Sequence, residues 1–304
     1  MAEAIEIGER AGARVQISAL TRRRSGPTGA GSATRRDCPS GPSERGQDVT
    51  FDVYPYTAGS APLTQIVPDW AHEGGLDALV ARLRTHADRG RLAREIAEQG
   101  REWDQTLVAW MPDGPGKADE GSLDRRHRRP PRGRPVETLL ALLEESSGRG
   151  MMVHFVMSED DVRHVMRHPL AMFGVGRAGA DARAGPLAEG KPHPRCYGTY
   201  PRILGHYVRE TGVLTLEAAV HKAAYRAGGE ARARGEGRVQ VGADADLVVF
   251  DPATVRDPRR TPIRIASRRA SSTCWWPGEM TIRDGRHTGA RGRPRVRPAA
   301  LSRR

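Results

Sequence analysis

The chain has 304 residues and a formal net charge of +12, and its hydrophobic residues make up 38%, below the ~45–50% usual in soluble domains. No apolar run approaches the ~20 residues that a membrane-spanning helix needs. The acidic N-terminal segment MAEAIEIGER lacks the basic start and apolar core of a signal peptide. These features exclude a membrane-spanning helix and favour a soluble protein.

Patterned and unpatterned segments alternate along the chain. Apolar residues at helical spacing predict helices over residues 2–10, 75–100 (a pair), 135–146, 159–168 and 212–224. Apolar runs and alternation predict strands over residues 14–18, 48–54 and 170–176, one that begins at 151, and two within 237–252. Alternating strands and helices are typical of an α/β protein with a mainly parallel sheet.

The unpatterned segments carry most of the surplus arginine. Two of them, residues 19–46 and 118–134, interrupt regions where an α/β fold ordinarily uses connections of ~2–6 residues. Both are rich in Arg, Gly, Ser and Pro and show neither the helical nor the strand period. We therefore expect one α/β unit over residues 1–235 that contains these segments, followed by C-terminal strands and a basic tail over 236–304.

Cys38, Cys196 and Cys274 are far apart in the sequence and form no CxxC pair. This spacing suggests neither a disulfide framework nor a structural zinc site. Unpaired thiols are typical of a reducing compartment, so we expect a cytoplasmic location.

Six patterned segments carry a resemblance to a known family. In chain order they are EAIEIGERAGARVQIS, DVTFDVYPYTAGSAPL, MVHFVMSEDDVRHVMRHPLAMFG, GKPHPRCYGTYPRILGHYVRETGVLTLEAA, GRVQVGADADLVVFDP and GEMTIRDGRHTGAR. Together they resemble the C-terminal half of the D-aminoacylase (N-acyl-D-amino-acid deacylase) family of the amidohydrolase superfamily. The resemblance implies an incomplete (β/α)8 TIM-type barrel with part of a small β-sandwich domain. It also implies zinc-assisted removal of the N-acyl group from N-acyl-D-amino acids, with the site at the carboxyl ends of the barrel strands.

The family's metal-binding and catalytic positions differ in this sequence. Where the family reads Ser-His-His-Lys, Ala19 and Leu20 replace the histidines and Thr21 replaces the lysine. Where it reads Gly-Ser-Asp-Gly, with the aspartate as general acid and base, residues 174–177 read Gly-Val-Gly-Arg, and we do not assign that role to Asp181 further on. The family's HxH and cysteine strands would precede Met1. We therefore expect no catalytic residue, no metal ligand and no zinc in this chain, and no activity.

Three substrate-facing positions match the family. Tyr54 and Ser60, in DVYPYTAGS, fall on its substrate-binding tyrosine and serine, and Arg195, in KPHPR, falls on the arginine that grips the substrate carboxylate. The alternatives are a strand-end tyrosine packed on a neighbour and a loop arginine in solvent.

Each unpatterned segment begins where family-like sequence is expected to continue, and family-like sequence resumes after it. Out-of-frame reading of GC-rich DNA yields mostly Arg, Gly, Ala, Pro and Ser. Our interpretation is that paired frame slips, in the gene or in its recorded sequence, produced these segments.

Two alternatives stay open. The basic clusters, such as Arg22 to Arg24, favour a non-catalytic protein that binds polyanions non-specifically or associates with a partner chain. His164 and His168 have the i, i+4 spacing of a helical metal site, to which His154 and His193 would add ligands, but a solvated pair on a surface helix is the commoner outcome of such spacing.

Overall fold

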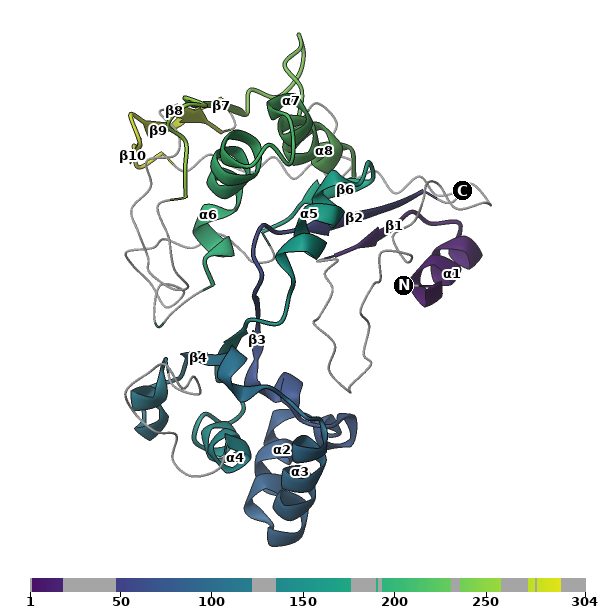
Figure 1. Ribbon diagram of the computed structural model, residues 1–304, viewed down its shortest axis with the longest axis vertical. Helices are drawn as coiled ribbons and strands as arrows, with labels where there is room; N and C mark the ends of the chain where they lie inside the picture. The colour runs from purple at the N-terminus through teal and green to yellow at the C-terminus, as the bar shows by residue number, and fades with distance from the viewer. Residues whose placement is uncertain are drawn as a thin grey trace.

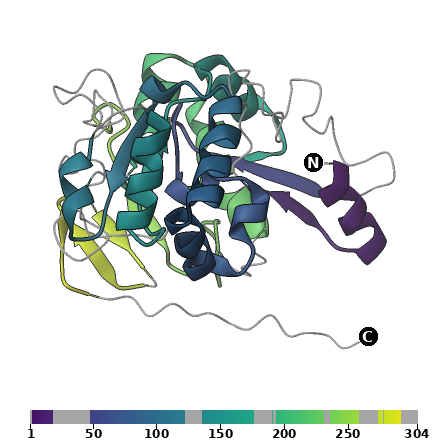
Figure 2. The same ribbon diagram turned by 90° about the horizontal axis from the view of Figure 1, so that it is seen from below.

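The computed structural model describes residues 2–18, 48–121, 135–175, 190, 193–230, 236–257, 273–276 and 278–290. The molecule is long, with a lobe around strands β1, β2 and β6 and a second lobe around helices α2 to α4 (Figure 1). Seen from below, α1 (purple) and the C-terminal strands (yellow) lie on opposite sides (Figure 2). Residues 19–47 and 122–134, which hold most of the two long unpatterned segments, lie outside the described residues.

The first lobe is built on a parallel sheet in the order β1-β2-β6. Its strands are β1 (Val15–Ile17), β2 (Val49–Val53) and β6 (Ala171–Phe173), so the predicted strands over 14–18, 48–54 and 170–176 are confirmed. All of β2 is buried. Phe51 and Val53 pack in the same core cluster as Val162 and Tyr207, on the helices, because alternate side chains of a strand point to opposite faces.

The helices of this lobe are α1 (Ala2–Ala11), α5 (Glu159–Arg167), α6 (Arg195–Arg202), a π-helix (Ile203–Glu210), α7 (Leu216–Val220), a second π-helix (His221–Tyr225) and α8 (Arg226–Glu230). The predicted helices over 2–10 and 159–168 are confirmed. The helix predicted over 212–224 begins later, at Leu216, because Thr215 caps it: the Thr215 hydroxyl accepts the Ala218 N–H at 3.2 Å.

The second lobe lies between β2 and α5 in the sequence. Its strands are β3 (Gly59–Pro62), β4 (Thr106–Trp110) and β5 (Met151–His154). Its helices are the 3-10 turns η1 (Leu63–Ile66), η2 (Asp69–His72), η3 (Trp103–Gln105) and η4 (Pro115–Asp119), and α2 (Gly75–Arg84), α3 (His86–Glu98) and α4 (Pro135–Glu145). The predicted helices over 75–100 and 135–146 are confirmed, and they enclose a core of their own, which includes Leu92 and Leu139.

The sheet of the second lobe departs from the sequence-based expectation. Strand-helix alternation predicted a mainly parallel sheet, but β5 lies between β3 and β4 and pairs antiparallel with both. The apolar run that predicts a strand at 151 fits a parallel and an antiparallel sheet equally well, because the period of a strand does not identify its partner strands.

The C-terminal region forms a four-stranded antiparallel sheet in the order β10-β9-β8-β7. Its strands are β7 (Leu247–Val249), β8 (Thr273–Trp275), β9 (Met280–Arg283) and β10 (Arg286–His287). Of the two strands predicted within 237–252, only β7 forms. Val239 and Val241 are 91% and 105% exposed, so these alternating side chains do not pack against a sheet in the described part of the chain. Strand β8 ends a segment that shows no period in the sequence.

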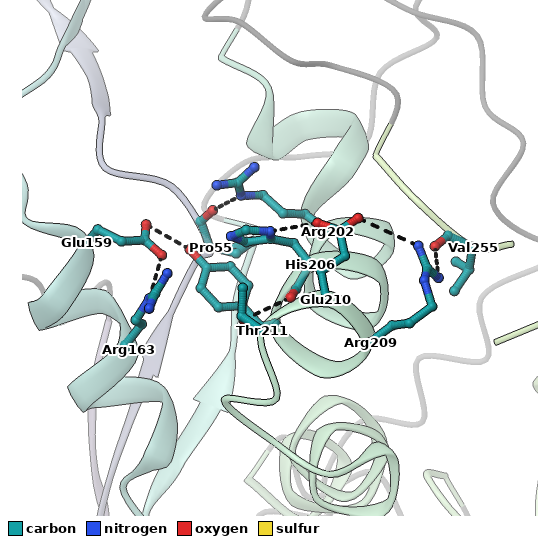
Figure 3. A network of polar contacts seen from close by, with 10 residues as sticks. Pro55, Glu159, Arg163, Arg202, His206, Arg209, Glu210, Thr211 and Val255 are labelled. Atoms are coloured by element: carbon teal, nitrogen blue, oxygen red, sulfur yellow. Dashed lines mark hydrogen bonds and ion pairs between the residues drawn. The ribbon is translucent and has the colours of Figure 1, made fainter. Parts of the chain in front are cut away.

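Residues 251–257 connect β7 to the helical layer. Arg209, on the first π-helix, donates to the carbonyl oxygen of Val255 at 2.6 Å (Figure 3). It also donates to the carbonyl oxygen of Pro252 at 2.9 Å. Gly205 permits this approach, because a Cβ atom there would lie 2.7 Å from the Val255 oxygen. In the part of the chain that the structure describes, no helix is both long and apolar enough to cross a bilayer.

Candidate substrate-binding site

The site lies where β2 ends and the chain crosses to β3, opposite the first turn of α6. Tyr54 follows β2 and is buried, and Arg195 is the first residue of α6. The guanidinium carbon of Arg195 lies 4.8 Å from the centroid of the Tyr54 ring. Arg195 Nη2 donates to the main-chain oxygen of Ser60 at 3.3 Å. The three residues that the sequence assigned to substrate binding therefore meet, with the difference that Ser60 contacts Arg195 through its carbonyl oxygen.

The guanidinium of Arg195 retains donor capacity. Its Nε atom is buried and has no hydrogen-bond acceptor among the described residues. A buried N–H without an acceptor is costly, and more so on a charged group. The planar fork of arginine matches the two oxygens of a carboxylate, so a ligand carboxylate that reached this edge of the guanidinium would satisfy it.

Tyr54 presents an uncharged hydroxyl beside this cation. Burial raises the pKa of Tyr54, and the neighbouring positive charge of Arg195 opposes part of that rise. The phenol is therefore protonated at neutral pH. Its oxygen lies 4.0 Å from the sulfur of Met157, and Tyr54, Tyr56 and Met157 form one buried cluster. The site thus combines a cation and a hydroxyl with an apolar wall.

His193, between the tyrosines and Arg195, is a member of the site that sequence reasoning did not assign to it. Its ring is 1% exposed. Nδ1 accepts the backbone N–H of Arg195 at 3.0 Å, and Nε2 lies 2.8 Å from the Ala58 oxygen. Ring centroids of Tyr54 and Tyr56 lie 5.8 and 5.4 Å away, both edge-on. The KPHPR segment that identifies Arg195 contains this histidine, but the sequence does not show that it reaches Ala58.

The turn after β2 is also held from the helical side. Arg202 donates through Nε to the Pro55 oxygen at 2.6 Å (Figure 3), and its guanidinium lies over Tyr56 and Tyr207 at 5.3 and 5.6 Å. The Tyr207 hydroxyl donates to Glu159 at 3.1 Å, and burial, followed by the Glu159 charge, raises the pKa of Tyr207. The peptide that carries Tyr54 is therefore anchored to α6 and the first π-helix.

A buried carboxylate lies at the carboxyl ends of the parallel strands. Asp52, on β2, accepts hydrogen bonds at Oδ2 from the Gln16 amide at 2.5 Å and the Ser18 hydroxyl at 2.9 Å. Gly174, just after β6, approaches so closely that a Cβ atom there would lie 2.7 Å from Asp52 Oδ1. The sequence placed Asp52 within the predicted strand over 48–54 and assigned it no role.

The histidine pair proposed from spacing does not share a helical face. Helix α5 ends at Arg167, and His168 has extended backbone. Its Nδ1 accepts the Leu170 N–H at 3.2 Å, and its ring packs 5.0 Å from Phe51. The expected solvated surface pair is wrong for His168, which packs on the sheet.

Within the described ranges, no three His, Cys, Asp or Glu side chains gather as a metal site would require. Ala19, Leu20 and Gly176 lie outside those ranges. The described residues alone do not fit a zinc ion, so we derive no hydrolytic step from them.

Comparison with known proteins identifies the family. Residues 44–288 match the amidohydrolase family. The chain belongs to this family. The resemblance found in the sequence is thereby confirmed.

Three curated relatives come from Alcaligenes xylosoxydans xylosoxydans. D-aminoacylase is 34% identical over 215 residues, which cover 69% of this chain and 34% of the relative. N-acyl-D-glutamate deacylase is 42% identical over 105 residues, 34% of this chain and 20% of the relative. N-acyl-D-aspartate deacylase is 33% identical over 138 residues, 45% of this chain and 26% of the relative. The chain thus spans about a third of the D-aminoacylase and less of the others.

Solved structures give the same fold. The crystal structure of a D-aminoacylase superposes with a TM-score of 0.66 at 26% identity, over 96% of this chain and 51% of that one. N-acyl-D-glutamate deacylase from Bordetella bronchiseptica, solved with zinc and a phosphonate inhibitor, gives a TM-score of 0.60 at 22% identity, over 94% of this chain and 51% of that one. The α/β fold of the D-aminoacylase amidohydrolases is therefore confirmed.

Proposed function

We propose that this site binds an N-acyl-D-amino acid, with the substrate carboxylate held by Arg195. The proposal rests on one observation: Arg195, Tyr54 and Ser60 meet, and the buried Nε–H of Arg195 has no acceptor among the described residues. The relatives are deacylases of N-acyl-D-amino acids by name. The reaction class proposed for the intact family is hydrolysis of a carbon-nitrogen bond other than a peptide bond.

The chemistry of the site suits such a ligand. A carboxylate beside Arg195 would gain charge-assisted hydrogen bonds in partly buried surroundings, where they are stronger than in open solution. The protonated Tyr54 hydroxyl would donate to the same anion or to the acyl oxygen. Tyr56 and Met157 offer apolar contact to the acyl chain or the amino-acid side chain.

We further propose that the chain as written binds this ligand without hydrolysing it. Support comes from Ala19 and Leu20, which replace the family's two histidines, and from Gly176, which replaces its aspartate. Loss of a proton-transfer group alone typically costs ~10²–10⁴-fold in rate. We expect no bound zinc in this chain, while zinc serves the intact family.

Calorimetric titration of the full chain with N-acetyl-D-methionine tests the binding proposal. We expect saturable binding to the wild type and a loss of at least ~10-fold in affinity in Arg195→Gln, since a hydrogen bond to a charged group contributes ~1.5–3 kcal/mol. Arg91→Gln is the control, because Arg91 also lies over an aromatic ring, that of Trp70 at 4.0 Å, in the second lobe. Equal affinity in wild type and Arg195→Gln would contradict the proposal. Release of D-methionine with added zinc would contradict the proposed inactivity.

Three further expectations, on domain organisation, location and binding partners, are also proposals. The parallel sheet is part of a (β/α)8 barrel within residues 1–235, and β7 to β10 belong to a separate β-sandwich unit within 236–304. The location is cytoplasmic. Non-specific polyanion binding and association with a partner chain stay predictions of the basic segments, and Arg22 to Arg24 lie outside the described residues.

A further inference from the structure

We infer that His193 is a positioning residue, which holds Arg195 against the Tyr54–Ser60 segment so that the guanidinium is pre-set for a ligand carboxylate. The inference rests on the proposed function of the site. It assigns no chemistry to His193 itself: the imidazole acts through Arg195.

The hydrogen bonds fix the tautomer of the ring. The backbone N–H of Arg195 can only donate, so Nδ1 of His193 accepts at 3.0 Å and carries no proton. The Ala58 carbonyl can only accept, so Nε2 carries the proton and donates at 2.8 Å. A neutral imidazole with Nε2–H satisfies both partners, whereas a proton on Nδ1 would face another donor.

This single ring joins two segments that are far apart in the sequence. One ring nitrogen holds the first peptide of α6, and the other holds the peptide between Tyr54 and Ser60. The edge contacts of Tyr54 and Tyr56 with the ring, at 68° and 88°, hold its plane. Because the imidazole is 1% exposed, water does not compete for either hydrogen bond.

Arg195 needs this support because its own side-chain contacts with the segment are weak. Its hydrogen bond to Ser60 is 3.3 Å long, beyond the usual range for N–H···O bonds. Stacking on Tyr54 sets the distance of the guanidinium from the ring more than its orientation in the plane above the ring. The backbone of Arg195 is better held than its guanidinium. We therefore infer that the hydrogen bonds of His193 set the orientation of the Arg195 guanidinium.

A catalytic or metal-binding role fits this geometry poorly. Both nitrogens of His193 have protein partners, so proton exchange with a ligand, or coordination of a metal, would break one of the two contacts. The positions of those partners point instead to support of the neighbouring arginine, as second-layer hydrogen bonds support a metal ligand.

The test compares two probes by calorimetry on the full chain: N-acetyl-D-methionine and its methylamide, which lacks the carboxylate. His193→Asn keeps an acceptor near Nδ1, His193→Gln keeps a donor near Nε2, and neither spans both partners. We expect each to weaken binding of the acid by about 10-fold and to change binding of the methylamide by less than about 2-fold. His206→Asn is the control, because His206 pairs with Glu210 at 2.9 Å (Figure 3) away from the site.

The outcomes separate the two proposals. If the wild type does not bind the acid, the proposed function fails, and this inference fails with it. If the wild type binds the acid and both variants bind it equally well, the inference alone fails. If the variants lose affinity for both probes by the same factor, His193 has only a structural role, and the inference is again overturned.

Discussion

The guanidinium of Arg195 stacks on the ring of Tyr54 at 4.8 Å, which brings the first turn of α6 against the peptide that leaves β2. Stacking of this kind contributes ~0.5–2 kcal/mol, more where water is excluded. The ring also covers one side of the cation without satisfying its N–H groups. The pair therefore stabilises the folded site and still leaves Arg195 able to bind an anion in its own plane.

Tyr54 should serve this pair mainly through its ring. Its hydroxyl lies 4.0 Å from the Met157 sulfur and also interacts with the Arg195 side chain, so Tyr54→Phe should lower the free energy of unfolding by about 1 kcal/mol. Tyr54→Leu removes the ring and should cost about 2 kcal/mol or more. Urea denaturation of both variants measures the difference. Equal losses would show that the hydroxyl, not the ring, carries the stabilisation.

Gly174 should not tolerate a side chain. In Gly174→Ala the new methyl carbon would meet Asp52 Oδ1 at 2.7 Å, and Asp52 is held by Gln16 and Ser18. We expect a loss of ~1–3 kcal/mol.

Gly90→Ala is the matched control for that substitution. Gly90 lies inside α3, and a Cβ there meets nothing closer than 3.9 Å. Alanine should stabilise the helix by ~0.5–1 kcal/mol. Thermal unfolding of both variants measures the difference. A melting temperature that shifts in the same direction for Gly174→Ala and Gly90→Ala would contradict the packing described around Asp52.

Lys222 should make stability depend on pH in the alkaline range. It is buried, and its Nζ donates to the oxygens of His168 and Ala171 at 2.5 and 3.2 Å. Burial, and then the Arg226 charge, lower the pKa of Lys222 from 10.5 to about 8. Between these two values the unfolded chain binds more protons than the folded chain, so stability rises with pH.

Lys222→Met isolates this effect, because the other titrating groups are common to both proteins. The free energy of unfolding of wild type minus that of Lys222→Met should increase from pH 7.5 to pH 10.5, by on the order of 1–3 kcal/mol. Chemical denaturation at a series of pH values measures it. A difference that stays constant or falls would show that Lys222 is charged in the fold throughout this range.

The frame-slip interpretation makes a prediction about the gene. Sequencing the coding DNA with about a kilobase upstream, and translating every forward frame, should reveal the His-His-Lys and Ser-Asp-Gly segments in a neighbouring frame. Finding neither would make the arginine-rich segments true parts of the protein. Polyanion binding measured at rising salt would then become the leading test, since phosphate contacts weaken as salt increases.

The apolar pattern of the sequence predicted the helices and strands that depend mainly on neighbouring residues. Strands β1, β2 and β6 follow from the apolar period. Helix α5 follows from apolar spacing with acidic residues in its first turn. The antiparallel pairing of β5, the unformed strand around Val239 and the contact of His193 with Ala58 were missed, because each depends on a segment distant in sequence. Tyr54, Ser60 and Arg195 came from the family motifs alone, and no periodicity identifies them.

Strands β3 and β5 enter and leave the second lobe side by side, with Gly59 opposite His154 and Pro62 opposite Met151. In topological terms, residues 63–150 are the loop of an elaborated β-hairpin. A two-residue turn from Pro62 to Met151 would close the same two strands. The helices of this lobe enclose a core of their own, but Leu107 and Ala109 of β4 pack in one cluster with Ala58. Only the part of the loop other than β4 is therefore exchangeable, because β4 supports the peptide that His193 contacts.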